Sequence, residues 1–273
     1  MKKIISLLLV LTLLGSITLA GCGNNNSNGD TSKEDNVITI GASPVPHEEI
    51  LNAIKADLET QGIELKIIQF TDYVKPNMAL ADGEIDANFF QHEPYMNKFK
   101  EEKGVDITSL GKVHIEPLGL YSNSASSIEE LKDGASIAIP NDPTNGGRAL
   151  ILLQNNGLIK LKEGIGLEAT ELDIAENPKN FVFKPLEAAQ LPRVLDDVDA
   201  AVINGNYALE AGLVPTEDAI LIEGADSPYA NIIAIRSGEE NSEKLQALLK
   251  ALHSDKVKEF IEENYNGGVV PTF

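Results

Sequence analysis

The stretch NDPTNGGRALILL, residues 141–153, places an arginine where a polar, glycine-bearing loop runs into an apolar segment. Arg148 falls in the first turn of the predicted helix, where its guanidinium could hold a carboxylate through two hydrogen bonds while loop amides donate alongside. A phosphate site of the nucleotide-binding kind is disfavoured, because the stretch matches neither glycine-rich phosphate-binding pattern and no P-loop lysine follows. A surface arginine or a structural ion pair is the alternative interpretation.

A group of ring-bearing residues lies close together in a chain that is only 5% aromatic and has no tryptophan: Tyr73, Phe89, Phe90 and His92. Rings gathered at predicted strand ends would line an apolar pocket with polar edges. Such a pocket suits a thioether, because sulfur–aromatic contacts are favourable by about 0.3–1.5 kcal/mol. Neighbours on a strand face opposite ways, so Phe90 and His92 share a face and one of the two phenylalanines is expected in the core. The alternative is that all of these rings belong to the core.

Three asparagines lie at predicted strand ends or starts, namely Asn204, Asn206 and Asn231. An asparagine carbonyl can accept a hydrogen bond from an ammonium group, and its amide can donate one to a carboxylate. Because asparagine is also common in loops, each of them could equally be a plain loop residue.

The sequence offers little for metal or enzyme chemistry. His47, His92 and His114 do not recur at the short spacings typical of zinc ligands, and the single cysteine, Cys22, is expected to carry a lipid. His47 begins a predicted helix and is interpreted as a surface or helix-end residue. Because no nucleophile elbow or usable carboxylate pair is visible, the sequence predicts no catalytic residue, no metal and no cofactor. A lipid-anchored hydrolase is the alternative class.

The elements that must position these residues alternate between short β-branched runs and segments of helical periodicity. This order predicts βαβ units, a parallel sheet and an α/β fold. Two similar halves, ending in ADGEIDANFF and DDVDAAVING, suggest two lobes that share one cleft at the carboxyl ends of their strands. The predicted strands are 37–43, 64–70, 136–140, 180–186, 199–204, 219–224 and 231–236. The predicted helices are 47–62, 76–86, 93–104 (polar and surface-type), 145–159, 187–197 and the segment from residue 242 onward.

The N-terminus predicts export and lipid attachment. Lys2 and Lys3 precede an apolar run that is too short, and wrongly flanked, for a transmembrane helix, and that is typical of a signal peptide. The run ends in Leu-Ala-Gly-Cys, which matches the bacterial lipobox. Residues 1–21 are therefore predicted to be a removed signal peptide, and Cys22 the acylated residue.

Residues 22–36 are small and polar without periodicity, and are interpreted as a flexible lipid-anchored linker to a folded part that begins at Val37. The formal net charge is −20 and there is no basic stripe, which argues against binding to nucleic acid or to anionic lipid. A single cysteine cannot form an internal disulfide, so the folded part depends on its core. The predicted location is the bacterial cell envelope, outside the cytoplasm, with a membrane anchor supplied by lipid.

Several long stretches resemble the methionine-binding lipoproteins of bacterial methionine ABC importers, the MetQ/NlpA family. The resemblance runs from the lipobox to the C-terminus. Its most specific stretches are FTDYVKPNMALADGEIDANFFQHEPY (70–95), AIPNDPTNGGRALILLQNNGLIKLK (138–162), LDIAENPKNF (172–181), LEAAQLPR (186–193), AVIN (201–204) and SPYANII (227–233). It implies a two-lobed periplasmic-binding-protein-like fold of type II with the ligand cleft between the lobes. Lobe 1 would comprise residues 37–119 plus 231–273, and lobe 2 residues 120–230.

The resemblance also implies a function. Members of the family bind L-methionine, and some bind D-methionine or a methionine-containing dipeptide. They pass the ligand to a membrane permease driven by a cytoplasmic ATPase, and they are not enzymes. The same role is expected here, for a protein that is a monomer. Another small amino acid or dipeptide is the alternative ligand, and a metal-binding or surface-adhesion lipoprotein is a less favoured class.

Carried onto this chain, the family's pocket positions agree with the roles argued from the residues. Arg148 would hold the α-carboxylate with help from Asn145, and Asn204 or Asn231 would fix the amino end. The ring-bearing residues of the first half would enclose the side chain, and Phe70 and His114 are further candidates. The predicted ligand-binding set is Tyr73, Phe90, His92, Asn145, Arg148, Asn204, Asn231, Phe70 and His114.

Overall fold

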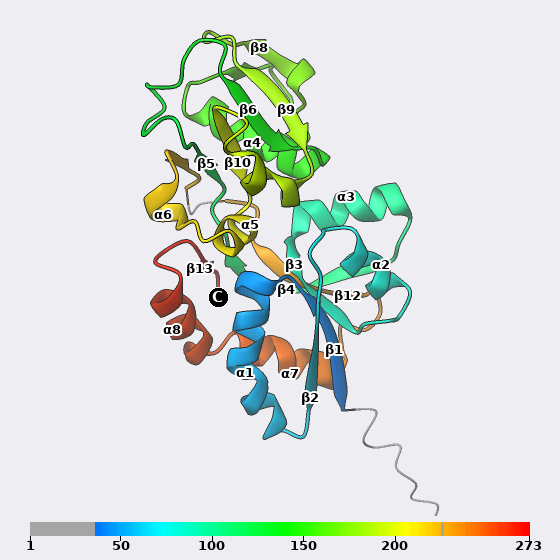
Figure 1. The fold of residues 1–273 in the computed structure, drawn as a ribbon. Coiled ribbons are helices and arrows are strands. Elements are labelled where there is room, and N and C mark those ends of the chain that lie inside the picture. Colours follow the sequence, from blue (N-terminus) through cyan, green and yellow to red (C-terminus); the bar gives the residue numbers. More distant parts are fainter. Residues whose placement is uncertain (1–35, 225–226) are drawn as a thin grey trace, which may run out of the picture.

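The computed structural model describes residues 36–224 and 227–273. The signal peptide predicted over 1–21, the lipidation site Cys22 and nearly all of the predicted linker lie outside these residues. In the described part, strands and helices form two α/β lobes, one above the other in Figure 1. The described residues contain no helix with the length and apolar character needed to span a bilayer.

The first lobe is built on a six-stranded sheet in the order β13-β4-β12-β3-β1-β2. β3 lies at its centre, parallel to β1 and antiparallel to β12. The sheet is therefore mixed, and the prediction of a parallel sheet is wrong for its second half, because β12 enters from the other lobe and runs against its neighbours. Its strands are β1 (Val37–Ala42), β2 (Glu64–Gln69), β3 (Ala87–His92), β4 (Ile107–Ile115), β12 (Asn231–Arg236) and β13 (Val270–Pro271).

Helices cover both faces of this sheet. The helices α1, α7 and α8 pack on the face that carries Ile233, whereas α2 and α3 pack on the face that carries Ile232. Adjacent residues of β12 thus serve two different cores, as the alternation of a strand requires. The elements are η1 (Pro44–Glu48), α1 (Glu49–Glu59), α2 (Lys75–Ala81), α3 (Glu93–Lys103), α7 (Glu243–Leu252) and α8 (Asp255–Asn264).

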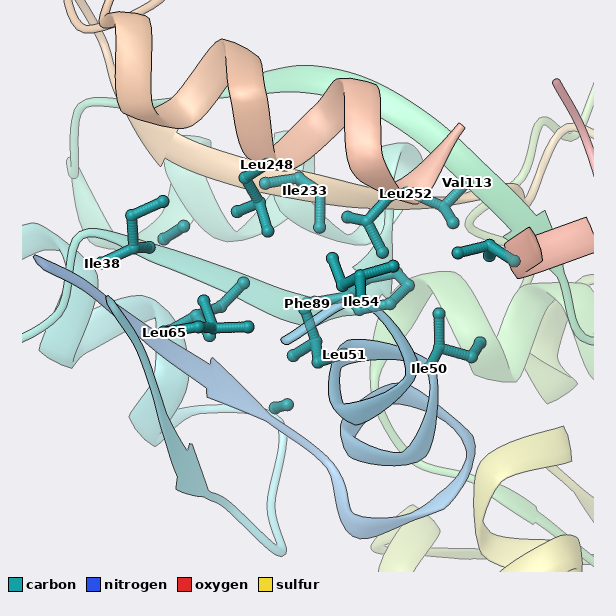
Figure 2. Close-up of a cluster of buried hydrophobic side chains, with 14 of the residues drawn as sticks. Ile38, Ile50, Leu51, Ile54, Leu65, Phe89, Val113, Ile233, Leu248 and Leu252 are labelled. Carbon is teal, nitrogen blue, oxygen red and sulfur yellow. The ribbon is translucent and has the colours of Figure 1, made fainter. Parts of the chain in front are cut away.

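The core beneath α1 follows directly from the sequence periodicity. Ile50, Leu51, Ile54 and Leu58 recur at helical spacing and are all fully buried. Figure 2 shows this face of α1 meeting Phe89 of β3, with the side chains of α7 closing the cluster from the other side.

The second lobe is built on a five-stranded sheet in the order β11-β5-β10-β6-β9. Its strands are β5 (Gly119–Tyr121), β6 (Ser136–Pro140), β9 (Val182–Leu186), β10 (Ala200–Ile203) and β11 (Leu221–Ile222). The lobe also contains α4 (Pro143–Asn155), η3 (Ala188–Val194), α5 (Gly205–Glu210) and α6 (Pro215–Asp218). A small separate sheet of β7 (Lys160–Leu161) and β8 (Ile174–Glu176) follows, with the short η2 (Glu171–Asp173) before β8.

The chain passes between the sheets immediately after β4. Gly119, which the sequence-based boundary leaves in the first lobe, already pairs with Ile203 of the second sheet. The passage therefore lies between Ile115 and Gly119. Neither β4 nor β5 is among the strands predicted from the sequence, and β4 alternates poorly between buried and exposed residues.

Other element boundaries differ for local reasons. The predicted helix 187–197 is the shorter 3-10 helix η3, which contains Pro192, a residue with no N–H to donate. The predicted C-terminal helix is split into α7 and α8 at Ser254, whose hydroxyl accepts from the amide of Val257 and begins α8. Gly104 ends α3 in the left-handed conformation as expected, but α3 is not a surface-type helix. It buries Tyr95, Met96 and Phe99.

A close backbone approach inside α4 gives a first prediction. A Cβ added at Gly147 would lie 2.0 Å from the carbonyl oxygen of Leu167. Gly147→Ala is therefore expected to lower the free energy of unfolding by about 1–3 kcal/mol through overpacking, although alanine usually favours a helix interior by about 1 kcal/mol. Urea unfolding curves measure this change. Gly166→Ala is the control, because its Cβ would meet nothing within 4 Å, and equal stability of both variants would contradict the prediction.

Candidate functional site

A cavity lies between the two lobes. The first lobe contributes the end of β3 and the start of α3, and the second lobe contributes α4 and the turn between β10 and α5. Glu116 follows β4 and Asn231 begins β12, so both stand where the chain passes between the sheets. The lining residues are Tyr73, Phe90, Gln91, His92, Tyr95, Glu116, Asn145, Arg148, Asn204, Gly205, Asn206 and Asn231.

Seven of the nine residues predicted as ligand-binding line this one cavity. The other two do not. Phe70 packs on the cluster that contains Leu80 and Ile85, and a Cβ at Gly41 would lie only 2.7 Å from its ring. His114 is fully buried one layer behind the lining, where it contacts Glu116.

Arg148 was predicted in the first turn of its helix, but it lies in the second turn of α4. The helix begins two residues earlier than expected, because Asp142 caps it by accepting from the backbone amide of Asn145 at 2.9 Å, with Pro143 in the next position. The backbone amide of Asn145 is therefore bonded within the protein. The Arg148 side chain is only 4% exposed, and the guanidinium is the part of α4 that carries positive charge to the cavity.

The guanidinium of Arg148 is held on several sides. Its Nε donates to Glu223 Oε1 at 3.0 Å, and its Nη2 donates to Glu223 Oε2 and to the carbonyl oxygen of Glu116, the last at 2.9 Å. The ring of Tyr229 lies 4.4 Å from the Arg148 Cζ, in cation–π contact. The ion-pair interpretation is therefore realised in the structure, while Arg148 also lines the cavity.

Asn145 joins the two walls of the cavity. Its Oδ1 lies 3.1 Å from His92 Nε2 across the lobes and accepts from Asn204 Nδ2 at 2.8 Å. His92 Nδ1 accepts from the amide of Tyr95, so we assign the ring proton to Nε2, which donates to Asn145. Burial, followed by the nearby Arg148 charge, lowers the pKa of His92 to about 3. His92 is thus a neutral donor near pH 7.

The side-chain amides of two asparagines in the second-lobe wall each have one atom without a hydrogen-bond partner in the described part of the chain. Asn204 Oδ1 and Asn206 Nδ2 are buried and lack a hydrogen-bond partner within the described part of the chain. An unpartnered buried acceptor and donor are costly in an empty protein. They are suited to the ammonium and carboxylate of a bound amino acid.

An aromatic wall faces this polar side. The Tyr73 ring lies 5.8 Å from the rings of both Phe90 and Tyr95, and 5.0 Å from that of Tyr207 in the other lobe. The Tyr73 hydroxyl donates to Asn206 Oδ1 at 2.6 Å. Phe89, beside Phe90 on β3, points into the core beneath α1, as the strand alternation predicts.

His47 lies at a helix end as predicted, in η1 just before α1, but the prediction of a surface residue is wrong. His47 is fully buried, because η1 packs against α5 of the other lobe and against the start of β12. Its Nδ1 contacts the Ser43 hydroxyl at 2.6 Å, and its Nε2 lies 3.2 Å from Asn231 Oδ1 and 3.2 Å from Glu116 Oε1. Burial lowers its pKa to about 4, although the Glu116 charge acts in the opposite direction.

His47, His114 and Glu116 form a buried group whose ligand-type atoms lie within 4.8 Å of one another. The sequence spacing had not suggested this cluster. The Glu116 Oε1 is 2.8 Å from His114 Nε2, and burial lowers the pKa of His114 to about 3. Burial raises the pKa of Glu116, and the His47 and Arg148 charges partly oppose this. We interpret the group as a polar network, in which His114 is hydrogen-bonded to Glu116 and His47 lies near the same carboxylate oxygen.

The predicted ligand-binding set lacks five of the lining residues, namely Gln91, Tyr95, Glu116, Gly205 and Asn206. Gln91 and Tyr95 lie in the stretch NFFQHEPY, so a wider window around Phe90 and His92 would have included them. Glu116 directly follows β4, a strand that was not predicted, so its position at a strand end was not visible.

Comparison with known proteins places the whole described chain in one group. The model of the NlpA lipoprotein family matches residues 38–273. The D-methionine-binding lipoprotein MetQ of Salmonella typhimurium is 45% identical over 261 residues, which cover 94% of each chain. A nutrient binding protein from Burkholderia cenocepacia, solved bound to methionine, is 49% identical with a TM-score of 0.84 and covers 86% of this chain and 100% of its own.

A third relative agrees with these two. Lipoprotein Tp32 from Treponema pallidum is 44% identical with a TM-score of 0.84, over 87% of this chain and all of that one. The likeness in structure confirms the predicted two-lobed periplasmic-binding-protein fold with mixed helices and sheets. Given the extent of the family match and the identity to these relatives, the chain belongs to the NlpA lipoprotein family.

Proposed function

We propose that this protein is the methionine-binding, substrate-binding component of a bacterial ABC importer, and that it is not an enzyme. The observation that carries the proposal is the interlobe cavity, in which one buried guanidinium faces a wall of aromatic rings. A relative that is 49% identical was solved bound to methionine. An amino-acid carboxylate and a thioether side chain are the two ends of a ligand that such walls complement.

The proposed roles follow from the contacts of each residue. Arg148 receives the α-carboxylate, and Asn145 holds the wall beside it through its bonds to His92 and Asn204. The open Oδ1 of Asn204 accepts from the α-ammonium, together with Asn231. Tyr73, Phe90 and His92 enclose the side chain, while His114 supports the lining residue Glu116 from behind.

Affinity in the micromolar range requires several of these contacts at once. A Kd of about 1 μM corresponds to about 8 kcal/mol. A hydrogen bond to a charged group contributes about 1.5–3 kcal/mol, and burial of the side chain contributes about 1.5–3 kcal/mol. The two charged ends and the thioether end of methionine therefore all need partners in the closed cavity.

The lobes are proposed to comprise residues 37–119 plus 231–273 and residues 120–230, and to close over the ligand about the passages between the sheets. The two sheets of the fold support this division, to within one residue at Gly119. We further propose that Cys22 carries the lipid that holds the protein at the membrane outside the cytoplasm. There, as a monomer, it would deliver ligand to a permease coupled to an ATPase.

Isothermal titration calorimetry with L-methionine tests the function. The protein is unfolded and refolded first, so that ligand carried through purification is removed. Saturable binding with a Kd in the micromolar range or below is expected. Absence of heat with L-methionine, D-methionine, related amino acids and dipeptides would contradict the proposal.

A dipeptide is the second candidate ligand, because a wider hollow adjoins the cavity and shares Tyr73 and Tyr95 with it. The additional residue of a dipeptide would occupy this hollow, beside Tyr73 and Tyr95. Methionine-containing dipeptides in the same titration separate the two candidates, since tighter binding of a dipeptide than of methionine would favour the extended ligand.

A further inference from the structure

Glu223 stands immediately after β11, and in the described part of the chain its carboxylate is bonded to one lining residue of the cavity, Arg148. It is not among the lining residues, whereas Arg148 is. Its carboxylate accepts from Nε and Nη2 of Arg148, the two nitrogens of one edge of the guanidinium. The Glu223 side chain is 15% exposed, and its Oε2 also lies 3.4 Å from the amide of Leu118, beside the passage between the lobes.

The contacts of Arg148 leave one nitrogen for a ligand. The Nη2 donates to the Glu116 carbonyl as well as to Glu223, and the Tyr229 ring covers one face of the plane. Within residues 36–224 and 227–273, the hydrogen bonds of the guanidinium involve Nε and Nη2 and not Nη1. Because the guanidinium is planar and rigid, a partner fixed on the Nε–Nη2 edge also fixes the direction of Nη1.

We infer that Glu223 is a positioning residue for ligand binding: it grips the far edge of Arg148 and so presents Nη1 to the ligand carboxylate in the cavity. This inference rests on the proposed function. The ammonium group of a lysine has no preferred plane and would not need a partner to orient it. The planar guanidinium of an arginine does, because it can rotate at the end of a long side chain. Glu223 also forms the ion pair that compensates the buried charge of Arg148 when the site is empty.

The opposite role for a carboxylate at this place is competition with the ligand. A competing Glu223 would occupy the position of the ligand carboxylate and would have to leave before binding. The geometry favours positioning, because Glu223 lies outside the cavity lining and binds the Nε edge, while Nη1 is left open. The two roles predict opposite effects of removing the charge, so one variant distinguishes them.

The test compares L-methionine with L-methioninol, which keeps the ammonium and the thioether but lacks the carboxylate. Calorimetry is carried out on the native chain, on Glu223→Gln and on Glu217→Gln, a control that removes the same charge from an exposed residue of the same lobe. Glu223→Gln is expected to weaken the binding of L-methionine about tenfold or more, because a hydrogen bond to the ligand carboxylate is displaced. The binding of L-methioninol is expected to weaken less than about twofold. The control is expected to leave both affinities unchanged.

Other outcomes overturn the inference. Tighter methionine binding by Glu223→Gln would show competition, and an equal loss for both ligands would show a purely structural role. An unchanged affinity for methionine would remove Glu223 from the site. If the native chain does not bind methionine, the proposed function fails and not the role of Glu223 alone.

A second variant is needed if Glu223→Gln does not fold. Circular dichroism checks this, and if Glu223→Gln is unfolded, the same ligand pair is measured on Glu223→Asp. That variant keeps the charge but shortens the side chain by one methylene. It is expected to lose affinity for methionine and not for methioninol, and equal affinities for methionine in Glu223→Asp and the native chain would contradict the inference.

Discussion

Replacement of Arg148 by alanine is expected to weaken L-methionine binding at least about tenfold, which corresponds to about 1.4 kcal/mol. Arg148 is the cation on the cavity lining, and a hydrogen bond to a charged group contributes about 1.5–3 kcal/mol. Its place cannot be taken by a neighbour, because the other polar lining groups near it are neutral amides or the Glu116 carboxylate. The loss should appear mainly for ligands that carry a carboxylate.

Calorimetry on refolded protein measures this change. Arg148→Lys is expected to retain part of the affinity, since it keeps the charge without the planar fork. Arg193→Ala removes an exposed arginine from the same lobe and is the control, with native affinity expected. Because the alanine variant also leaves Glu223 without its partner, circular dichroism must show that it is folded. Native affinity in a folded Arg148→Ala protein would remove Arg148 from the site.

Phe89→Ala is expected to lower the free energy of unfolding by about 3–5 kcal/mol, the usual cost of removing a buried phenylalanine side chain. Phe89 is fully buried on β3, between β12 and β1 at the centre of the first sheet. Its ring meets the edge of His47 at 4.6 Å and lies 5.2 Å from that of His114. The ring therefore fills the core beneath α1 (Figure 2). It also packs against the two buried histidines.

Urea unfolding followed by circular dichroism gives the free energy of unfolding of each variant. Phe273→Ala is the matched control, because the Phe273 side chain is 38% exposed at the C-terminus. Its expected loss is below about 1 kcal/mol, as for most surface substitutions. A Phe89→Ala protein that loses no more than this control would show that the cluster collapses around the missing ring, contrary to the close packing of a core.

Much of the site could be predicted from single positions. The strand alternation separated Phe90 and His92 from Phe89, and the structure puts the first two on the cavity and the last in the core. His47 shows the limit of this approach. Its place at a helix start suggested a surface residue, but it is buried by contacts with Asn231, which is 184 residues away in the chain. The pattern of residues in a short stretch of sequence cannot indicate a partner that is distant in the chain.

Glu223 is a second case of the same kind. Nothing in AILIEG distinguishes this glutamate from the other acidic residues of an acidic chain. Its pairing with Arg148 joins residues that are 75 positions apart. Arg148 was predicted in the first turn of its helix but lies in the second, because the cap at Asp142 starts α4 two residues earlier than predicted.

The sequence by itself determined the α/β class, the apolar face of α1, the family and seven of the residues that line the cavity. These depend on periodicity, on turn and cap chemistry and on motifs, all of which are written along short stretches of chain. Only the tertiary structure decided the mixed sheet, the burial of His47, the Glu116 network and the grip of Glu223 on Arg148. Each of these depends on which distant segments pack together, because burial and hydrogen bonding are properties of the space around a side chain.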